Sequence, residues 1–181
     1  ELSIAEGEEM DLDAFKHQLL LRQYPEALHR AVGFLAARAH SIREIERKLE
    51  QRRYLPDTIE MVVYWLEKDK LLDDEAFAKT WVQTRSAHQL GKARILQELR
   101  LKGVDREIAE AALSEMDGDE SEDAATELAG KLLSRYDSDD PMETMRKAVQ
   151  AMQRRGYPYE DASRALKAAL KQKSTEEDEE N

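Results

Sequence analysis

The chain has 181 residues, of which 41% are hydrophobic and 37% are charged, and it contains no cysteine. The lack of cysteine excludes disulfides and thiolate metal sites, and no apolar run reaches the roughly 18 residues that a membrane span needs. The first residues also lack the basic and apolar stretches of a signal peptide, so we expect a cytoplasmic protein with no membrane partner. Strand-like alternation is scarce, and only seven glycines and four prolines interrupt the chain. The fold class predicted is therefore all-α.

The net charge of −11 is concentrated in three short segments. Residues 1–20, 117–123 and 174–181 each carry a net charge of −5, which leaves the rest of the chain at +4. Acidic segments of this kind are usually solvated and without fixed structure. We therefore expect residues 1–25 to be partly disordered or an extra helix, 117–123 to be a flexible linker, and 174–181 to be a disordered tail.

The first predicted structural unit spans residues 26–72. Leu28, Ala31, Val32 and Leu35 indicate a helix over about 26–39. A basic middle helix follows from Ser41, and apolar residues at the i, i+3, i+4, i+7 spacing predict a third helix over about 57–70.

Two further units follow, at 73–116 and 124–173. In the second unit a helix over about 74–88 precedes the middle segment 91–104, and apolar residues from Ile108 to Leu113 mark a third helix. In the third unit the middle segment is 144–157, and helical patterns lie on both sides of it.

The three middle segments align with one another at offsets of 50 and 53 residues. Corresponding apolar anchors are Ile45, Ile95 and Ala148, followed by Leu49, Leu99 and Met152. Repeats of this length are typical of stacked helical arrays. The sequence therefore predicts three tandem three-helix repeats that form an elongated, curved array, and we expect a monomer.

Helix ends are predicted from capping residues. The capping-box spacing occurs at Ser41 with Glu44, Asp57 with Glu60, and Asp140 with Glu143. Gly103 and Gly156 stand where a left-handed residue closes a helix. Because Arg53 replaces that glycine in the first unit, we expect the first middle helix to end differently.

The middle segments carry most of the positive charge of the structured chain. Residues 41–55, 91–103 and 145–157 have net charges of +2, +3 and +4. Such segregation favours a binding face for an anionic partner. Cations in the last turn of a helix also stabilise its dipole, which is the alternative explanation for Arg52, Lys102 and Arg155.

Catalytic patterns are missing from the sequence. The four histidines are scattered, and Asp73, Asp74 and Glu75 fit the start of a helix better than a metal site. There is no glycine-rich phosphate loop and no nucleophile elbow. We therefore expect a non-enzymatic protein with no catalytic residue, cofactor or metal.

Four motifs together resemble one family. They are Ala39–Leu49 with its His-Ser start, Leu71–Ala78 with its Asp-Asp pair, Gly91–Leu99 with Lys102-Gly103-Val104 and an upstream arginine, and Arg154–Tyr157. In this order and spacing they resemble the RecX family. The similarity runs from about residue 26 to 172.

The resemblance implies a regulator that binds the RecA nucleoprotein filament in its helical groove and inhibits its ATPase, strand-exchange and co-protease activities. We expect the contacts to come from nine cations: Arg43, Arg47, Arg85, Lys92, Arg94, Arg100, Lys102, Arg154 and Arg155. The main alternative is a module that binds DNA directly, since three-helix units can resemble helix-turn-helix domains. Weak binding of single- or double-stranded DNA beside RecA is a further expectation. A helical scaffold for an unrelated protein would explain the repeats but not the motifs.

Overall fold

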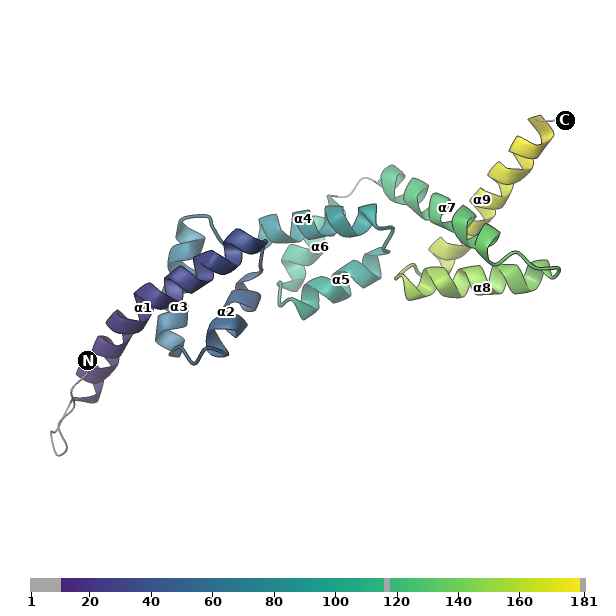
Figure 1. The fold of residues 1–181 in the computed structure, drawn as a ribbon. Helices are drawn as coiled ribbons and strands as arrows, with labels where there is room; N and C mark the ends of the chain where they lie inside the picture. Colours follow the sequence, from purple (N-terminus) through teal and green to yellow (C-terminus); the bar gives the residue numbers. More distant parts are fainter. Residues whose placement is uncertain (1–10, 116–117, 180–181) are drawn as a thin grey trace. The chain divides into compact units, whose positions relative to one another are not determined.

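A computed structural model describes residues 11–115 and 118–179. Within these ranges the chain forms nine α-helices and no strand, which confirms the all-α prediction (Figure 1). The chain divides into two compact units, Glu1–Asp73 and Asp74–Asn181. The first unit contains one three-helix repeat and the second contains two.

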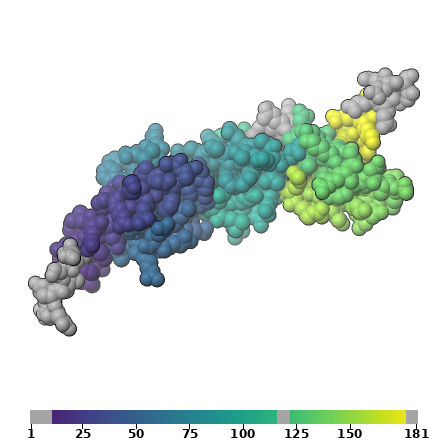
Figure 2. All heavy atoms as spheres, viewed as in Figure 1, coloured from purple at the N-terminus to yellow at the C-terminus, as the bar shows by residue number. Residues whose placement is uncertain are grey.

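The first repeat consists of α1 (Leu12–Ala37), α2 (Ile42–Glu50) and α3 (Pro56–Lys68). Figure 2 shows one face of this repeat, at the purple and blue end of the described chain. The buried core comprises Ala27, Ala31, Ile45, Leu49, Ile59, Val62, Val63, Leu66 and Leu72. The predicted anchors Ile45 and Leu49 have no exposed surface.

Helix α1 begins much earlier than the predicted start near residue 26. Asp11 caps it by accepting a hydrogen bond from the Asp13 amide, and the helix continues through Pro25. Tyr24 is partly buried against the core of the repeat, so tertiary packing extends the helix past a residue that usually interrupts one. Residues 12–25 are thus helical, and residues 1–10 lie outside the described part.

Only one of the first repeat's two predicted capping boxes is present. Ser41 and Glu44 form both reciprocal hydrogen bonds at the start of α2, as predicted. The box predicted for Asp57 and Glu60 is wrong, because the N-cap of α3 is Leu55, two residues before Asp57, and Pro56 is the first helical residue. Proline is preorganised for that position and lacks the N–H that would otherwise need a cap.

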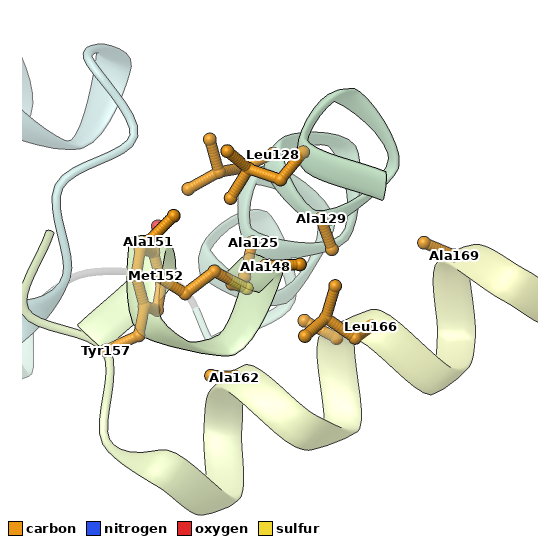
Figure 3. Packing of buried hydrophobic residues seen from close by; sticks show 12 residues of the cluster. Ala125, Leu128, Ala129, Ala148, Ala151, Met152, Tyr157, Ala162, Leu166 and Ala169 are labelled. Atoms are coloured by element: carbon orange, nitrogen blue, oxygen red, sulfur yellow. The ribbon is translucent and has the colours of Figure 1, made fainter. Parts of the chain in front are cut away.

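The described residues of the second unit form six helices in two repeats. They are α4 (Asp74–Ala87), α5 (Lys92–Leu101) and α6 (Arg106–Ser114), then α7 (Gly118–Arg135), α8 (Pro141–Arg154) and α9 (Tyr159–Glu179). Each repeat has its own apolar core. In the third repeat, side chains of α7, α8 and α9 converge on one centre (Figure 3). The predicted anchors Ile95, Leu99, Ala148 and Met152 are all fully buried.

Two acidic segments predicted to lack structure are largely helical. Residues 118–123, expected to be a linker, form the start of α7, and residues 174–179, expected to be a tail, belong to α9. Glu122 in this part of α7 pairs with Arg164 of α9 at 3.3 Å. The boundary between compact units lies at Asp73–Asp74, and not in the acidic segment. Residues 116–117 and 180–181 are outside the described part.

The three middle helices end in the same way. Gly103 and Gly156 have φ angles of 81° and 93°, which confirms their predicted left-handed conformation. Arg53 also has a positive φ of 63°, so the different ending expected for the first repeat is wrong. In each case the next amide donates to a carbonyl five residues back, as Tyr54 does to Leu49 over 3.4 Å. This closing bond imposes the left-handed conformation even on an arginine.

We predict that Arg53→Gly stabilises the first repeat. A left-handed conformation costs a residue with a Cβ about 1 kcal/mol, and glycine avoids this cost. The free energy of unfolding, measured with urea, should rise by up to about 1 kcal/mol. Arg53→Ala removes the same charge but keeps the Cβ, so a similar gain in that variant would contradict the explanation.

His40 is a second local determinant of stability in the first repeat. It is 5% exposed, and its Nδ1 lies 2.9 Å from the Arg38 carbonyl oxygen. Burial lowers the pKa of His40 below its ordinary value of 6.5. Nearby Arg38 and Lys48 also lower this pKa, whereas the Arg38 carbonyl and Glu44 oppose the shift. His40 is therefore held in its neutral form, in which Nδ1–H donates to the carbonyl.

The stability of this protein should therefore depend on the protonation of His40. Because the unfolded chain binds this proton more tightly, the stabilisation is fully present above about pH 6.5 and declines as the pH falls towards the lower folded-state pKa. Urea unfolding of wild type and His40→Gln, measured from pH 7.5 down to pH 5, should show a smaller loss in the variant. His29→Gln, at an exposed histidine of the same repeat, should keep the wild-type pH dependence. Parallel curves for wild type and His40→Gln would contradict the assignment.

Candidate partner-binding surface

The nine predicted contact residues are distributed over all three repeats. Arg43 and Arg47 lie on α2, Arg85 on α4, and Lys92, Arg94 and Arg100 on α5; Lys102 caps α5, Arg154 ends α8, and Arg155 caps α8. Their local environments differ. Some are engaged by acidic or aromatic neighbours, and others are exposed to solvent.

Arg43 lies in an acidic environment. It is bonded to Glu46 at 2.8 Å and Glu50 at 3.1 Å. These three side chains border an open groove of about 630 Å³ between α2 and α3, which Glu60 and Glu67 also line. The groove thus has four glutamates and one arginine among its lining residues, so this face of the first repeat is acidic despite the net charge of +2 on residues 41–55.

Arg85 belongs to a packed cluster in the second repeat. Its guanidinium carbon lies 4.1 Å from the ring centre of Trp81, and the Lys102 ammonium lies at the same distance from that ring. Trp81 in turn stacks on Phe77, with ring centres 5.7 Å apart. Arg85 and Lys102, two of the predicted contact cations, therefore help to hold the second repeat together. Cation–π contacts of this kind become stronger where water is partly excluded.

Glu98 is the acidic counterpart of this cluster. Its two carboxylate oxygens lie 2.8 Å from Arg85 Nε and 3.4 Å from Arg94 Nε. Arg85 Nε and Glu98 Oε2 are both buried. Among the described residues, neither atom has a hydrogen bond of good geometry, so the contact between them is an ion pair. Glu98 thus fixes Arg85 mainly by charge.

The cations of α5 do not form one stripe. Ile95 and Leu99 face the core, and at about 100° per residue Lys92, Arg94 and Arg100 leave the helix in different directions. Lys92 and Arg100 are exposed, as is Arg154 at the end of α8. Within the described ranges, none of these three forms an ion pair.

Backbone contacts bring part of the set together across two repeats. The Gly91 amide at the start of α5 donates to the Arg155 carbonyl at the end of α8 over 2.9 Å. Arg155 Nη1 also lies 3.4 Å from the His88 carbonyl oxygen. The start of α5, with Lys92 and Arg94, therefore adjoins Arg154 and Arg155 within the second unit.

Two hollows mark the surface of the third repeat. An open groove of about 700 Å³ runs along α8, with Met142, Met145 and Val149 among its lining residues. A narrower pocket of about 360 Å³ is lined by residues of α7 and α9 together with Lys92 of α5. Across the described ranges there is no group of three or more potential metal ligands. The same ranges contain no helix that is long and apolar enough to span a membrane.

Sequence reasoning missed the neighbours that engage the cations. The i, i+4 spacing of Trp81 with Arg85, and of Arg94 with Glu98, is a readable signal for contacts on one helix. The pairing of Arg85 with Glu98 joins two helices and has no such signal. Whether the nine cations contact a partner stays a prediction.

These features define a class: an all-α protein of tandem three-helix repeats with separate cores and differently charged surfaces. The chain matches family models described as the first, second and third three-helix domains of RecX, over residues 27–66, 73–113 and 119–166. The chain therefore belongs to the RecX family of regulatory proteins.

Individual relatives support the same assignment. "Regulatory protein RecX" of Amycolatopsis mediterranei is 31% identical over 155 residues, which cover 85% of this chain and 89% of the relative. The protein of the same name from Salmonella arizonae is 39% identical over 118 residues, covering 60% and 71%. The crystal structure of RecX from Lactobacillus salivarius has a TM-score of 0.76 at 24% identity, covering 82% of this chain and 97% of that one, which shows the shared fold.

We predict that Arg85→Met destabilises the second repeat. Methionine keeps the aliphatic volume but leaves Glu98, which is 19% exposed, without its nearest cation. The unfolding free energy should fall by about 1–3 kcal/mol, as for other polar groups left poorly paired. Arg94 lies farther from Glu98 than Arg85 does and is more exposed. Arg94→Met should therefore lower the unfolding free energy by less than about 0.5 kcal/mol. Equal losses in the two variants would refute the structural role of Arg85.

Proposed function

We propose that this chain binds the RecA nucleoprotein filament in its helical groove and restrains the ATPase, strand-exchange and co-protease activities of RecA. The observation that carries the proposal is the presence of all three RecX domains, in order, from residue 27 to 166. The partner follows from what the family resemblance implies. No catalytic chemistry is required of the chain itself.

The repeat architecture suits a polymeric target. Each repeat has its own core and can present its own surface to a subunit of a filament. Weak contacts made by linked modules combine through effective concentration, so a chain of linked repeats can bind tightly without one large interface. A filament offers the same subunit surface many times, which is what this mode of binding needs.

Among the nine predicted contact residues, the exposed cations are the best candidates for direct contact. Lys92, Arg100 and Arg154 are exposed, and their charges are available to carboxylates or phosphates. Arg85 and Lys102 act first within the fold, through Trp81. Replacing those two residues would confuse a binding defect with a folding defect.

The first experiment measures RecA ATPase on single-stranded DNA with and without this protein. The proposal expects the rate to fall as protein is added. A parallel titration of DNA without RecA tests the alternative, a directly DNA-binding module. DNA binding at the same concentrations without RecA, with affinity falling steeply as salt is raised, would favour that alternative. An unchanged ATPase rate together with no binding to the assembled filament would refute the proposal.

We predict that the triple variant Lys92→Glu, Arg100→Glu and Arg154→Glu loses inhibition. Reversing exposed charges at an electrostatic interface mainly slows association, and the concentration needed for half-inhibition should rise by roughly tenfold or more. The matched control is Arg22→Glu, Lys167→Glu and Lys171→Glu, which makes the same change in net charge at exposed helical positions outside the predicted set. If the control loses as much inhibition as the test variant, total charge and not this surface governs binding.

A further inference from the structure

Gly91 occupies a position where local rules favour another residue. It is the N-cap of α5, with φ −74° and ψ 156°, a conformation open to any residue. Among the residues that the structure describes, no side chain caps this helix start. At the equivalent position of the first repeat, Ser41 forms a capping box. Because serine is among the preferred N-caps, the capping of α5 does not explain the glycine.

The explanation lies in a neighbour from the other repeat. A Cβ on Gly91 would lie 2.3 Å from the carbonyl oxygen of Gly156, and 2.7 Å from the amide nitrogen of Tyr157. Both contacts are with backbone atoms, which cannot rotate away as a side chain could. The Gly91 amide is meanwhile hydrogen-bonded to the Arg155 carbonyl at 2.9 Å. Any side chain at Gly91 would therefore push the two backbones apart.

Two independent constraints favour glycine at position 156, its backbone conformation and its contact with Arg94. Its φ of 93° favours glycine because it ends α8 in the left-handed conformation. A Cβ there would also lie 2.4 Å from Cβ and 2.5 Å from the backbone nitrogen of Arg94. Nearby, Gln89 Nε2 donates to Glu127 Oε2 of α7 over 3.0 Å. Contacts between the two repeats thus reach α7 as well as α8.

We propose that Gly91 and Gly156 are positioning residues whose backbone contact fixes the second repeat against the third. This contact sets the spacing between the cations at the start of α5, Lys92 and Arg94, and those at the end of α8, Arg154 and Arg155. The consequence for filament binding rests on the proposed function. The claim that the two glycines fix the second repeat against the third is independent of the proposed function.

The sharpest test is Gly91→Ser, because local and tertiary effects have opposite signs. If only the α5 cap matters, serine should stabilise the protein, as Ser41 does in α2. If the backbone contact matters, Gly91→Ser should lower the midpoint of thermal unfolding. Gly130→Ala is the control, since a Cβ at this helical glycine would meet nothing within 4 Å, and it should not lower the midpoint. A higher midpoint in Gly91→Ser would overturn the proposal.

The arrangement of the repeats can be measured directly. Because the chain has no cysteine, spin labels can be attached at Leu101→Cys in α5 and Met142→Cys in α8, positions that are 68% and 79% exposed. Wild type should give a narrow distribution of distances between the labels, and Gly91→Ser should give a broader or shifted one. Gly130→Ala should resemble wild type. An unchanged distribution in Gly91→Ser would overturn the proposal.

A second variant keeps the test decisive if Gly91→Ser fails to fold. Gly156→Asn and Gly103→Asn replace two glycines that end helices with positive φ, and asparagine tolerates that conformation better than most residues. Gly156 lies against Arg94 of the second repeat. Gly156→Asn should therefore broaden the label distances, whereas Gly103→Asn, at the end of α5, should not. Equal distributions in the two variants would overturn the proposal.

Binding to RecA filaments, measured with the same variants, separates the two claims. If filament binding requires the wild-type spacing between the cations of α5 and α8, Gly91→Ser should bind the filament about tenfold more weakly. Its helix content, measured by far-ultraviolet circular dichroism, should be unchanged. Altered distances with wild-type affinity would overturn the claim about cation spacing. If wild type itself does not bind the filament, the proposed function fails, and the label distances still decide whether the glycines fix the repeats.

Discussion

The repeats are organised around pairs of apolar side chains on their middle helices. Ile45 with Leu49, Ile95 with Leu99, and Ala148 with Met152 have no exposed surface, and each pair lies in a separate core. Because each core is small, the flanking helices must be held close to the middle helix for the apolar surface to be removed from water. The direction of every outward-facing side chain on the middle helices follows from this burial.

The charged surface of each repeat is set by which cations find partners within the fold. Arg43 is neutralised by Glu46 and Glu50, so the groove beside α2 is acidic. In the second repeat, Arg85 and Lys102 lie against the ring of Trp81. Exposed cations such as Lys92 and Arg154 keep their charge available at the surface. The net charge of a segment therefore does not by itself set the charge of one face, and the three repeats can offer a partner different electrostatic contacts.

The contact between Gly91 and Gly156 shows how a small local feature can organise a larger unit. An array of small repeats gains rigidity only where neighbours touch closely, and two backbones approach most closely where neither has a Cβ. Glycine at both positions allows a hydrogen bond between the Gly91 amide and the Arg155 carbonyl. The second and third repeats accordingly belong to one compact unit, whereas the first repeat forms a unit of its own.

The sequence by itself determined the all-α class, the three repeats, their buried anchors, the Ser41 cap and the left-handed glycines, because all of these depend on residues close together in the chain. The family also followed from motifs in the sequence. Only the tertiary structure decided the helical course of residues 118–123, the pairing of Arg85 with Glu98, and the role of Gly91. These features depend on packing or on atoms from other helices, and no periodicity or spacing along one segment encodes such contacts.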